Sequence, residues 1–266
     1  MRTQQLLYIA AGVVVFIMLL LVGWGLTHKS GDGGGNGRSA AGFVGAVERA
    51  QAATVMITVS GSGANEAPLQ MGSGFVVSSD GLIVTAAHVT GGLPVFNAVF
   101  ADGSVARAEL VAADAAADVA IYRATPGKPL TFLSFADSNQ VKAGQAVVLM
   151  GAPYGLVGTA TSGIVSAVNR QIGAPVNEED PFAAGALSGP VKSFIQTDAA
   201  LTAGGSGGPL LNGAGQVIGM ASARESRGEP GAGLAFATPS NVVKAVVDRA
   251  RQAPPAGRAP GPTPQP

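Results

Sequence analysis

The chain has 266 residues, of which 47% are hydrophobic and only 12% are charged, a composition that excludes an intrinsically disordered protein. Sixteen basic residues balance sixteen acidic ones, so no positive excess is available to neutralise phosphates, and we expect no nucleic acid partner. Cysteine is absent, which excludes disulfides, thiol nucleophiles and cysteine-ligated zinc; we expect no metal and no cofactor.

The amino-terminal part of the chain carries a membrane signal. Residues 6–26 (LLYIAAGVVVFIMLLLVGWGL) contain no charge and, at ~1.5 Å per residue, would span roughly 30 Å as a helix. A cleaved signal peptide usually has an apolar core of ~7–15 residues, although Gly23-Trp24-Gly25 leaves cleavage open as an alternative. We predict an uncleaved transmembrane signal anchor at 6–26, with residues 1–5 as a cytoplasmic end.

Low-complexity segments flank the region that we expect to fold. Residues 27–41 are rich in glycine and small polar groups, a composition typical of a flexible linker. Residues 253–266 are rich in proline, which excludes a helix or a central strand and predicts a disordered tail. The folded domain is therefore expected at 42–252.

Within 42–252 the sequence predicts mainly short strands. A helix is expected at 43–52, with Phe43, Val44 and Val47 on one side. Twelve apolar runs of strand length follow: VMITVSG, SGFVVSS, LIVTAAHV, AVFAD, VARAELVAA, DVAIYRA, AVVLMGAP, GIVSAV, FIQTDA, PLLN, QVIGMASA and GLAFATP. Asp-Gly and Asn-Gly pairs between them are typical hairpin turns. This pattern indicates an all-β barrel or sandwich of antiparallel sheet.

A last helix is expected from Asn241 to Arg251. Ser240 is its predicted N-cap, and its predicted buried stripe consists of Val242, Val243, Val246 and Val247.

One serine lies among four glycines, in Gly204-Gly205-Ser206-Gly207-Gly208. Such a run provides tight turns and converging backbone N–H groups, which acyl transfer requires, although a plain flexible loop has the same composition. The run also fits the G-x-S-x-G pattern of α/β-hydrolases, but those enzymes place their histidine after the serine. No histidine follows Ser206, so that class is excluded.

Only two histidines could act as a base. His28 lies beside Lys29 at the predicted membrane edge, whereas His88 closes the apolar strand LIVTAAHV. By itself His88 is more typical of a satisfied core residue.

Asp118 opens the apolar strand DVAIY, and a buried carboxylate needs a partner such as an imidazole N–H. Asp114 is a rival in a predicted loop. The order His88, Asp118, Ser206 is that of chymotrypsin-like enzymes.

Three stretches carry a specific resemblance to one family. GSGFVVSSDGLIVTAAHV (72–89), DAAADVAIYR (114–123) and FIQTDAALTAGGSGGPLLNGAGQVIGM (194–220) resemble the histidine, aspartate and serine regions of the HtrA/Deg serine proteases. The resemblance implies a chymotrypsin-like fold of two six-stranded antiparallel β-barrels. His88 and Asp118 would come from the first barrel and Ser206 from the second.

The resemblance also implies roles for further residues. Backbone N–H groups of Gly204, Gly205 and Ser206 would bind the oxyanion. Ala200 would form the base of the primary specificity pocket and Ala221, Ser222 and Ala223 one wall of it. This uncharged base favours small aliphatic residues at the cleaved position.

The sequence departs from the family in three places. Most members carry PDZ domains after the protease domain, and we expect none here. Gly205 stands where asparagine is common, and residues 177–190 form an acidic insertion that we interpret as a solvated loop.

Together these features predict a serine endopeptidase that cleaves unfolded or misfolded proteins. The resemblance implies a protease domain on the outer face of a bacterial cytoplasmic membrane, held by a single amino-terminal helix, and a homotrimer. One alternative is a membrane-anchored, non-catalytic protease-like binding or chaperone module. Another is a hydrolase of esters or small amides that uses the same residues.

Overall fold

The computed structural model describes residues 40–59, 69–125, 127–172, 192–224 and 234–252. The predicted signal anchor, the tail at 253–266, the insertion at 177–190 and His28 lie outside the described residues. Among the helices in the described ranges, none is long and apolar enough to cross a membrane.

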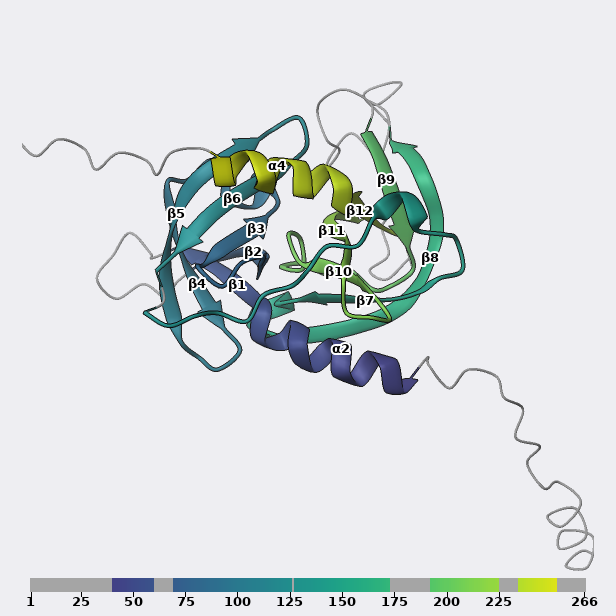
Figure 1. The fold of residues 1–266 in the computed structure, drawn as a ribbon, viewed down its shortest axis with the longest axis horizontal. Coiled ribbons are helices and arrows are strands. Elements are labelled where there is room, and N and C mark those ends of the chain that lie inside the picture. The colour runs from purple at the N-terminus through teal and green to yellow at the C-terminus, as the bar shows by residue number, and fades with distance from the viewer. Residues whose placement is uncertain (1–39, 60–68, 126, 173–191, 225–233, 253–266) are drawn as a thin grey trace, which may run out of the picture. The chain divides into compact units, whose positions relative to one another are not determined.

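Two closed antiparallel barrels of six strands each make up the fold (Figure 1), which confirms the predicted arrangement. In the first barrel the strands follow the order β1-β2-β3-β6-β5-β4. Their bounds are β1 Thr54–Val59, β2 Leu69–Val76, β3 Leu82–Thr85, β4 Val95–Phe100, β5 Val105–Asp114 and β6 Val119–Ala124. Pairing of β1 with β4 closes this barrel.

The second barrel repeats the same closed arrangement in the order β10-β11-β12-β9-β8-β7. Its strands are β7 Ala146–Gly151, β8 Thr159–Ile172, β9 Lys192–Thr197, β10 Pro209–Asn212, β11 Val217–Arg224 and β12 Ala235–Pro239. Pairing of β7 with β10 closes it. The twelve predicted apolar runs correspond to these twelve strands.

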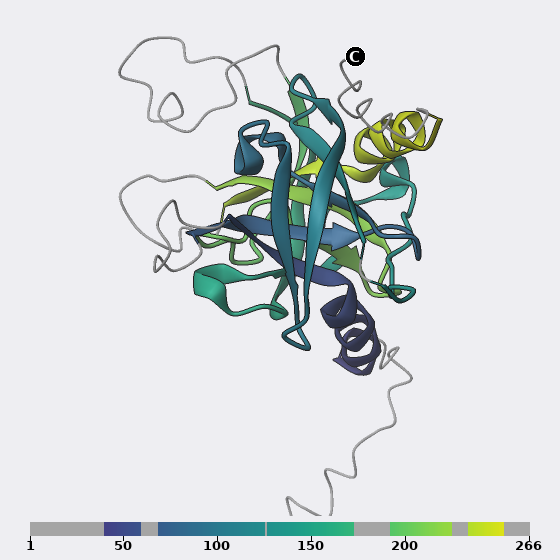
Figure 2. The ribbon, with the colours of Figure 1, turned by 90° about the vertical axis from the view of Figure 1, so that its left-hand side faces the viewer.

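Two longer helices link the barrels. Helix α2 (Ala40–Ala53) leads into β1 but contacts β7 of the second barrel, while α4 (Ser240–Gln252) follows β12 and contacts β5 and β6 of the first. Figures 1 and 2 show α4 along the upper side of the domain and α2 along its lower side. The chain thus crosses between the barrels at both ends of the described domain.

Both helices were predicted, with errors in detail. Val242 on α4 was expected to be buried but is 41% exposed, and Val44, placed on one side of α2 with Phe43 and Val47, is 60% exposed. The inner face of α4 consists of Val243, Val246, Val247 and Ala250. The Ser240 hydroxyl, predicted to cap α4, instead donates to the carbonyl of Ala136 at 2.6 Å.

Three shorter helices complete the domain: α3 (Ala87–Thr90) and the 3-10 turns η1 (Ser138–Gln140) and η2 (Pro153–Gly155). One of them, α3, replaces the end of a predicted strand, because β3 stops at Thr85. It determines where His88 lies.

Candidate active site

His88 lies on the one-turn helix α3, and not on a strand as its apolar neighbours had predicted. Residue Ala86 is extended, and Gly91 ends the turn with φ 56° while its N–H donates to the carbonyl of Ala87 at 3.0 Å. This change of direction leaves the His88 side chain 47% exposed. The imidazole is therefore held at the surface of the barrel instead of inside it.

Asp118 lies in the turn that precedes β6, with φ 56°, a left-handed conformation that aspartate tolerates better than most residues. It is only 5% exposed. One carboxylate oxygen, Oδ2, lies 2.8 Å from Nδ1 of His88, and the other accepts the backbone N–H of the same histidine at 3.0 Å. The Ser222 hydroxyl donates to Oδ2 at 2.7 Å.

These contacts set the charge of the carboxyl group. Burial raises the pKa of Asp118, but hydrogen bonds from the His88 ring, the Ser222 hydroxyl and the His88 backbone, together with the charge of His88, hold the pKa below its usual value. An ionised carboxylate only accepts hydrogen bonds. Nδ1 of His88 must therefore carry a proton, and in the neutral ring Nε2 then holds the lone pair.

The loop that holds Ser206 is fixed through its backbone. The Ser206 carbonyl accepts the N–H of Ser73 at 2.8 Å, and the Gly207 N–H donates to the carbonyl of Ala221 at 2.7 Å. Ser73 belongs to the first barrel and Ala221 to the second. The loop that contains Ser206 is therefore held between the two barrels.

The glycine at 207 is required by space and by conformation. Its φ is +87°, and a Cβ there would lie 2.1 Å from the Ser73 carbonyl oxygen and 2.5 Å from Oγ1 of Thr85. Gly207 thus lets the loop approach β2 and β3 closely.

Ser206 comes close to the helix that carries His88. Between them lies Gly72, where a Cβ would be 2.7 Å from Cγ1 of Val89 and 3.0 Å from the Ser206 carbonyl oxygen. Asp118 is joined to the same region by Ser222, the neighbour of Ala221 on β11. The structure therefore joins His88 and Asp118 directly and places the Ser206 carbonyl beside Gly72, which also faces Val89 of α3. Within the described residues no hydrogen bond links the Ser206 hydroxyl to the imidazole.

The residues before Ser206 form a β-turn of defined type. The Gly205 N–H donates to the carbonyl of Thr202 at 2.9 Å, and Gly204 has φ +87°, which together are typical of a type II turn. Gly205, predicted as a third donor to the oxyanion, has its N–H bound in this turn and does not supply one here. The N–H groups of Gly204 and Ser206 donate to no described group.

The residues predicted for the specificity pocket differ from one another in their exposure and contacts. Ala200 is exposed, its carbonyl accepts the Thr161 hydroxyl at 2.8 Å, and it lines a cavity of about 20 Å³ with Gly205. Ser222 is 3% exposed and its hydroxyl donates to Asp118, so its side chain faces this carboxylate.

Ala221, also expected in that wall, is 1% exposed. Ala223 pairs with Phe236 beyond a bulge in β11. A serine in an apolar strand was the signal for the role of Ser222, because a buried hydroxyl needs a partner.

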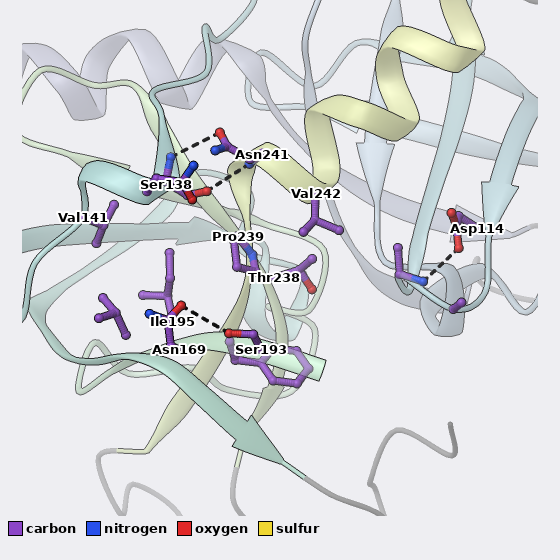
Figure 3. A pocket seen from close by; sticks show the side chains of 15 residues that line it. Asp114, Ser138, Val141, Asn169, Ser193, Ile195, Thr238, Pro239, Asn241 and Val242 are labelled. Carbon is purple, nitrogen blue, oxygen red and sulfur yellow. Dashed lines mark hydrogen bonds between the residues drawn. The ribbon is translucent and has the colours of Figure 1, made fainter. Parts of the chain in front are cut away.

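A much larger cavity, of about 580 Å³, lies elsewhere (Figure 3). It is bordered by the start of α4, by η1 and by β8, β9 and β12, and includes the buried Thr238, whose hydroxyl has no partner among the described groups. Neither His88, Asp118 nor Ser206 lines it. The larger cavity is therefore separate from the three predicted catalytic residues.

Known proteins share this sequence and fold. Residues 72–220 match the family described as the trypsin-like peptidase domain. The probable periplasmic serine endoprotease DegP-like of Brucella suis is 41% identical over 186 residues, which cover 70% of this chain and 34% of that protein. Its counterpart in Halomonas elongata is 40% identical over 189 residues, 71% of this chain and 37% of that protein. The chain thus spans about a third of the length of these curated relatives.

A solved structure shows the same arrangement. The HtrA-type protease AlgW with a decapeptide has a TM-score of 0.66 and 27% identity to this chain. The match covers 79% of this chain and 67% of that one.

Proposed function

The chain belongs to the trypsin-like peptidase family and, within it, to the HtrA/Deg proteases, and we propose on that basis that it is a serine endopeptidase. In this proposal Ser206 is the nucleophile, His88 the general base and Asp118 the residue that orients and stabilises the imidazolium. The observation that carries the proposal is the pairing of Asp118 with both Nδ1 and the backbone N–H of His88.

The proposed reaction has two halves. Oγ of Ser206 attacks the peptide carbonyl while Nε2 of His88 takes the hydroxyl proton, and the N–H groups of Gly204 and Ser206 bind the oxyanion. His88 then gives its proton to the leaving amine, which breaks the peptide bond and leaves an acyl-enzyme. Water, activated by His88, releases the new carboxylate and restores Ser206. A single oxyanion donor typically contributes ~3–4 kcal/mol to such a reaction.

The direct test replaces the nucleophile. Ser206→Ala should lower the turnover of an unfolded protein such as casein by about 10⁴–10⁶-fold, with an unchanged thermal unfolding midpoint. The wild type should react covalently with a fluorophosphonate, because this reagent needs an activated serine, while Ser206→Ala and His88→Ala should not. Equal casein turnover by the wild type and Ser206→Ala would exclude the proposal.

The non-catalytic binding module makes the opposite prediction. One observation favours it, namely that no hydrogen bond joins the Ser206 hydroxyl to His88 within the described residues. A wild type that binds casein but neither cleaves it nor reacts with the fluorophosphonate would establish that module. Comparing the hydrolysis of a peptide with that of an ester would identify an esterase.

We extend the proposal to substrates. Among the described residues, no charged residue lines the proposed pocket base, which includes Ala200, Leu201 and Thr202. This favours small aliphatic residues at the cleaved position. A peptide library that varies this position should show Ala and Val cleaved faster than Arg, Lys or Asp. Preferential cleavage after Arg or Lys would contradict the assignment.

We also propose the location and assembly that the sequence predicts. The apolar run at 6–26 and relatives named as periplasmic support an anchor that holds the protease domain outside the cytoplasm. Deletion of residues 2–26 should move the protein from the membrane fraction to the soluble one. For the predicted homotrimer, the exposed Val44 on α2 offers an apolar contact, and light scattering of the solubilised full chain should give three times the chain mass.

A further inference from the structure

Ser73, on strand β2, has a fully buried side chain that meets both barrels. Its exposed fraction is 0%. The hydroxyl donates to the carbonyl of Gly204 at 2.6 Å and accepts the N–H of Ala152, next to η2, at 2.8 Å. One hydroxyl thus binds two segments of the second barrel from a strand of the first.

The backbone of Ser73 is engaged as well. Its N–H donates to the carbonyl of Ser206 at 2.8 Å, and its own carbonyl accepts the Thr85 hydroxyl at 2.7 Å. Ser73 therefore binds the carbonyl groups on both sides of Gly205. These two carbonyls belong to the same residues whose N–H groups face the proposed oxyanion.

The hydroxyl contact bears on the oxyanion turn. A peptide group is planar, so the Gly204 carbonyl fixes the plane of the bond to Gly205. With no side chain at 204 or 205, this turn has great conformational freedom. A donor supplied from β2 restricts that freedom at one of its two glycines.

We propose that Ser73 is a positioning residue for the reaction. Its hydroxyl holds the Gly204–Gly205 peptide so that the N–H groups of Gly204 and Ser206 converge on the oxyanion. This inference rests on the proposed function. Ser73 touches no reacting atom and acts through the loop. A buried hydroxyl that only satisfies its own hydrogen bonds would stabilise the fold without changing the rate of the chemical step.

The test compares two buried hydroxyls. Ser73→Ala removes the contact with the oxyanion turn. Thr54→Val, on β1, removes an equally buried hydroxyl that donates to the carbonyl of Ala50 on α2 at 2.8 Å. We expect Ser73→Ala to lower both kcat and the rate of fluorophosphonate labelling by ~10–100-fold, with KM changed less than about twofold. Thr54→Val should keep both rates within about twofold of the wild type. It should lower the unfolding midpoint about as much as Ser73→Ala does.

Each outcome decides one point. Equal labelling rates for Ser73→Ala and the wild type would overturn the inference while leaving the proposed function intact. A wild type that never labels would instead contradict the proposed function. If Ser73→Ala does not fold, Ser73→Cys keeps a side chain of similar size with a weak donor. Its labelling rate should fall by ~3–30-fold, a smaller loss than for alanine. A labelling rate equal to that of the wild type would again overturn the inference.

Discussion

The two barrels hold their candidate catalytic groups by different means. In the first, side chains bind side chains, since Asp118 binds the His88 ring and also accepts the Ser222 hydroxyl from β11 of the second barrel. In the second, Ser206 is held by its backbone, through the carbonyl at 206 and the N–H of Gly207. The arrangement in the first barrel therefore depends on the identity of the side chains, and that in the second on the space that glycines leave open.

The interiors of the two barrels do not show the same contrast. In the first barrel, Phe96 and Tyr122 are buried with ring centroids 4.4 Å apart. In the second barrel, Phe194 on β9 and Phe236 on β12 are buried with ring centroids 6.3 Å apart, and an aliphatic cluster that includes Leu210 lies there as well. The difference between the barrels therefore lies in how the candidate groups are held and not in the composition of the cores.

The largest expected effect comes from the side-chain pair. Asp118→Asn keeps the shape of the residue, but an amide can donate to Nδ1 of His88 and favour the tautomer that cannot accept the serine proton at Nε2. We expect kcat to fall by about 10⁴-fold, measured on a peptide substrate at saturation. Circular dichroism should show the native fold. A loss below tenfold would mean that the first barrel does not depend on residue identity in this way.

In the second barrel, we expect a substitution to act through a steric clash. In Gly207→Ala, the new Cβ would lie 2.1 Å from the Ser73 carbonyl oxygen at φ +87°, and we expect the free energy of unfolding to fall by about 3 kcal/mol or more. Urea denaturation measures this change. Gly213→Ala is the matched control, because nothing lies within 4 Å of a Cβ there, and its effect should stay within ~1 kcal/mol. Similar losses in both variants would contradict the argument.

Ser222→Ala tests the bridge between the barrels. Losing a hydrogen bond to the buried Asp118 carboxylate should lower stability by about 2 kcal/mol at pH 7. The folded pKa of Asp118 lies below its unfolded value, so this carboxylate stabilises the fold above pH ~4 and loses that effect as pH falls through the folded pKa. The deficit of Ser222→Ala should therefore shrink below pH ~4, as unfolding experiments across pH can show. A deficit independent of pH would separate Ser222 from the ionisation of Asp118.

The sequence was sufficient for the features that repeat along the chain. Apolar runs of strand length and Asp-Gly turns predicted the strands, and the motifs around His88 and Asp118 predicted the contact between these two residues. The sequence did not predict the features that depend on tertiary contacts. The apolar run before His88 does not reveal that β3 stops at Thr85 and that α3 turns the imidazole outward.

Contacts between distant segments were also beyond the sequence. The family resemblance implied a pocket wall at Ser222 but did not reveal that its hydroxyl donates to a carboxylate 104 residues away. Gly205 looked like an oxyanion donor until the turn from Thr202 engaged its N–H. Ser73 carried no signal of its own, since one serine in GSG says nothing about a partner 131 residues distant.

The smallest expected effect separates the two aspartates that the sequence left in competition. Asp114 closes β5, accepts the N–H of Ala117 at 2.9 Å and pairs with Arg249 of α4. Asn at 114 can still accept the Ala117 N–H, so Asp114→Asn removes only a half-exposed ion pair, worth ~0–1 kcal/mol, and should keep kcat within about twofold of the wild type. The measurement is the kcat ratio of Asp114→Asn to Asp118→Asn under one set of conditions. If the two variants lost activity equally, the hydrogen bonds to His88 would not be what distinguishes the acid of the first barrel, and the contrast between the barrels would lose its basis.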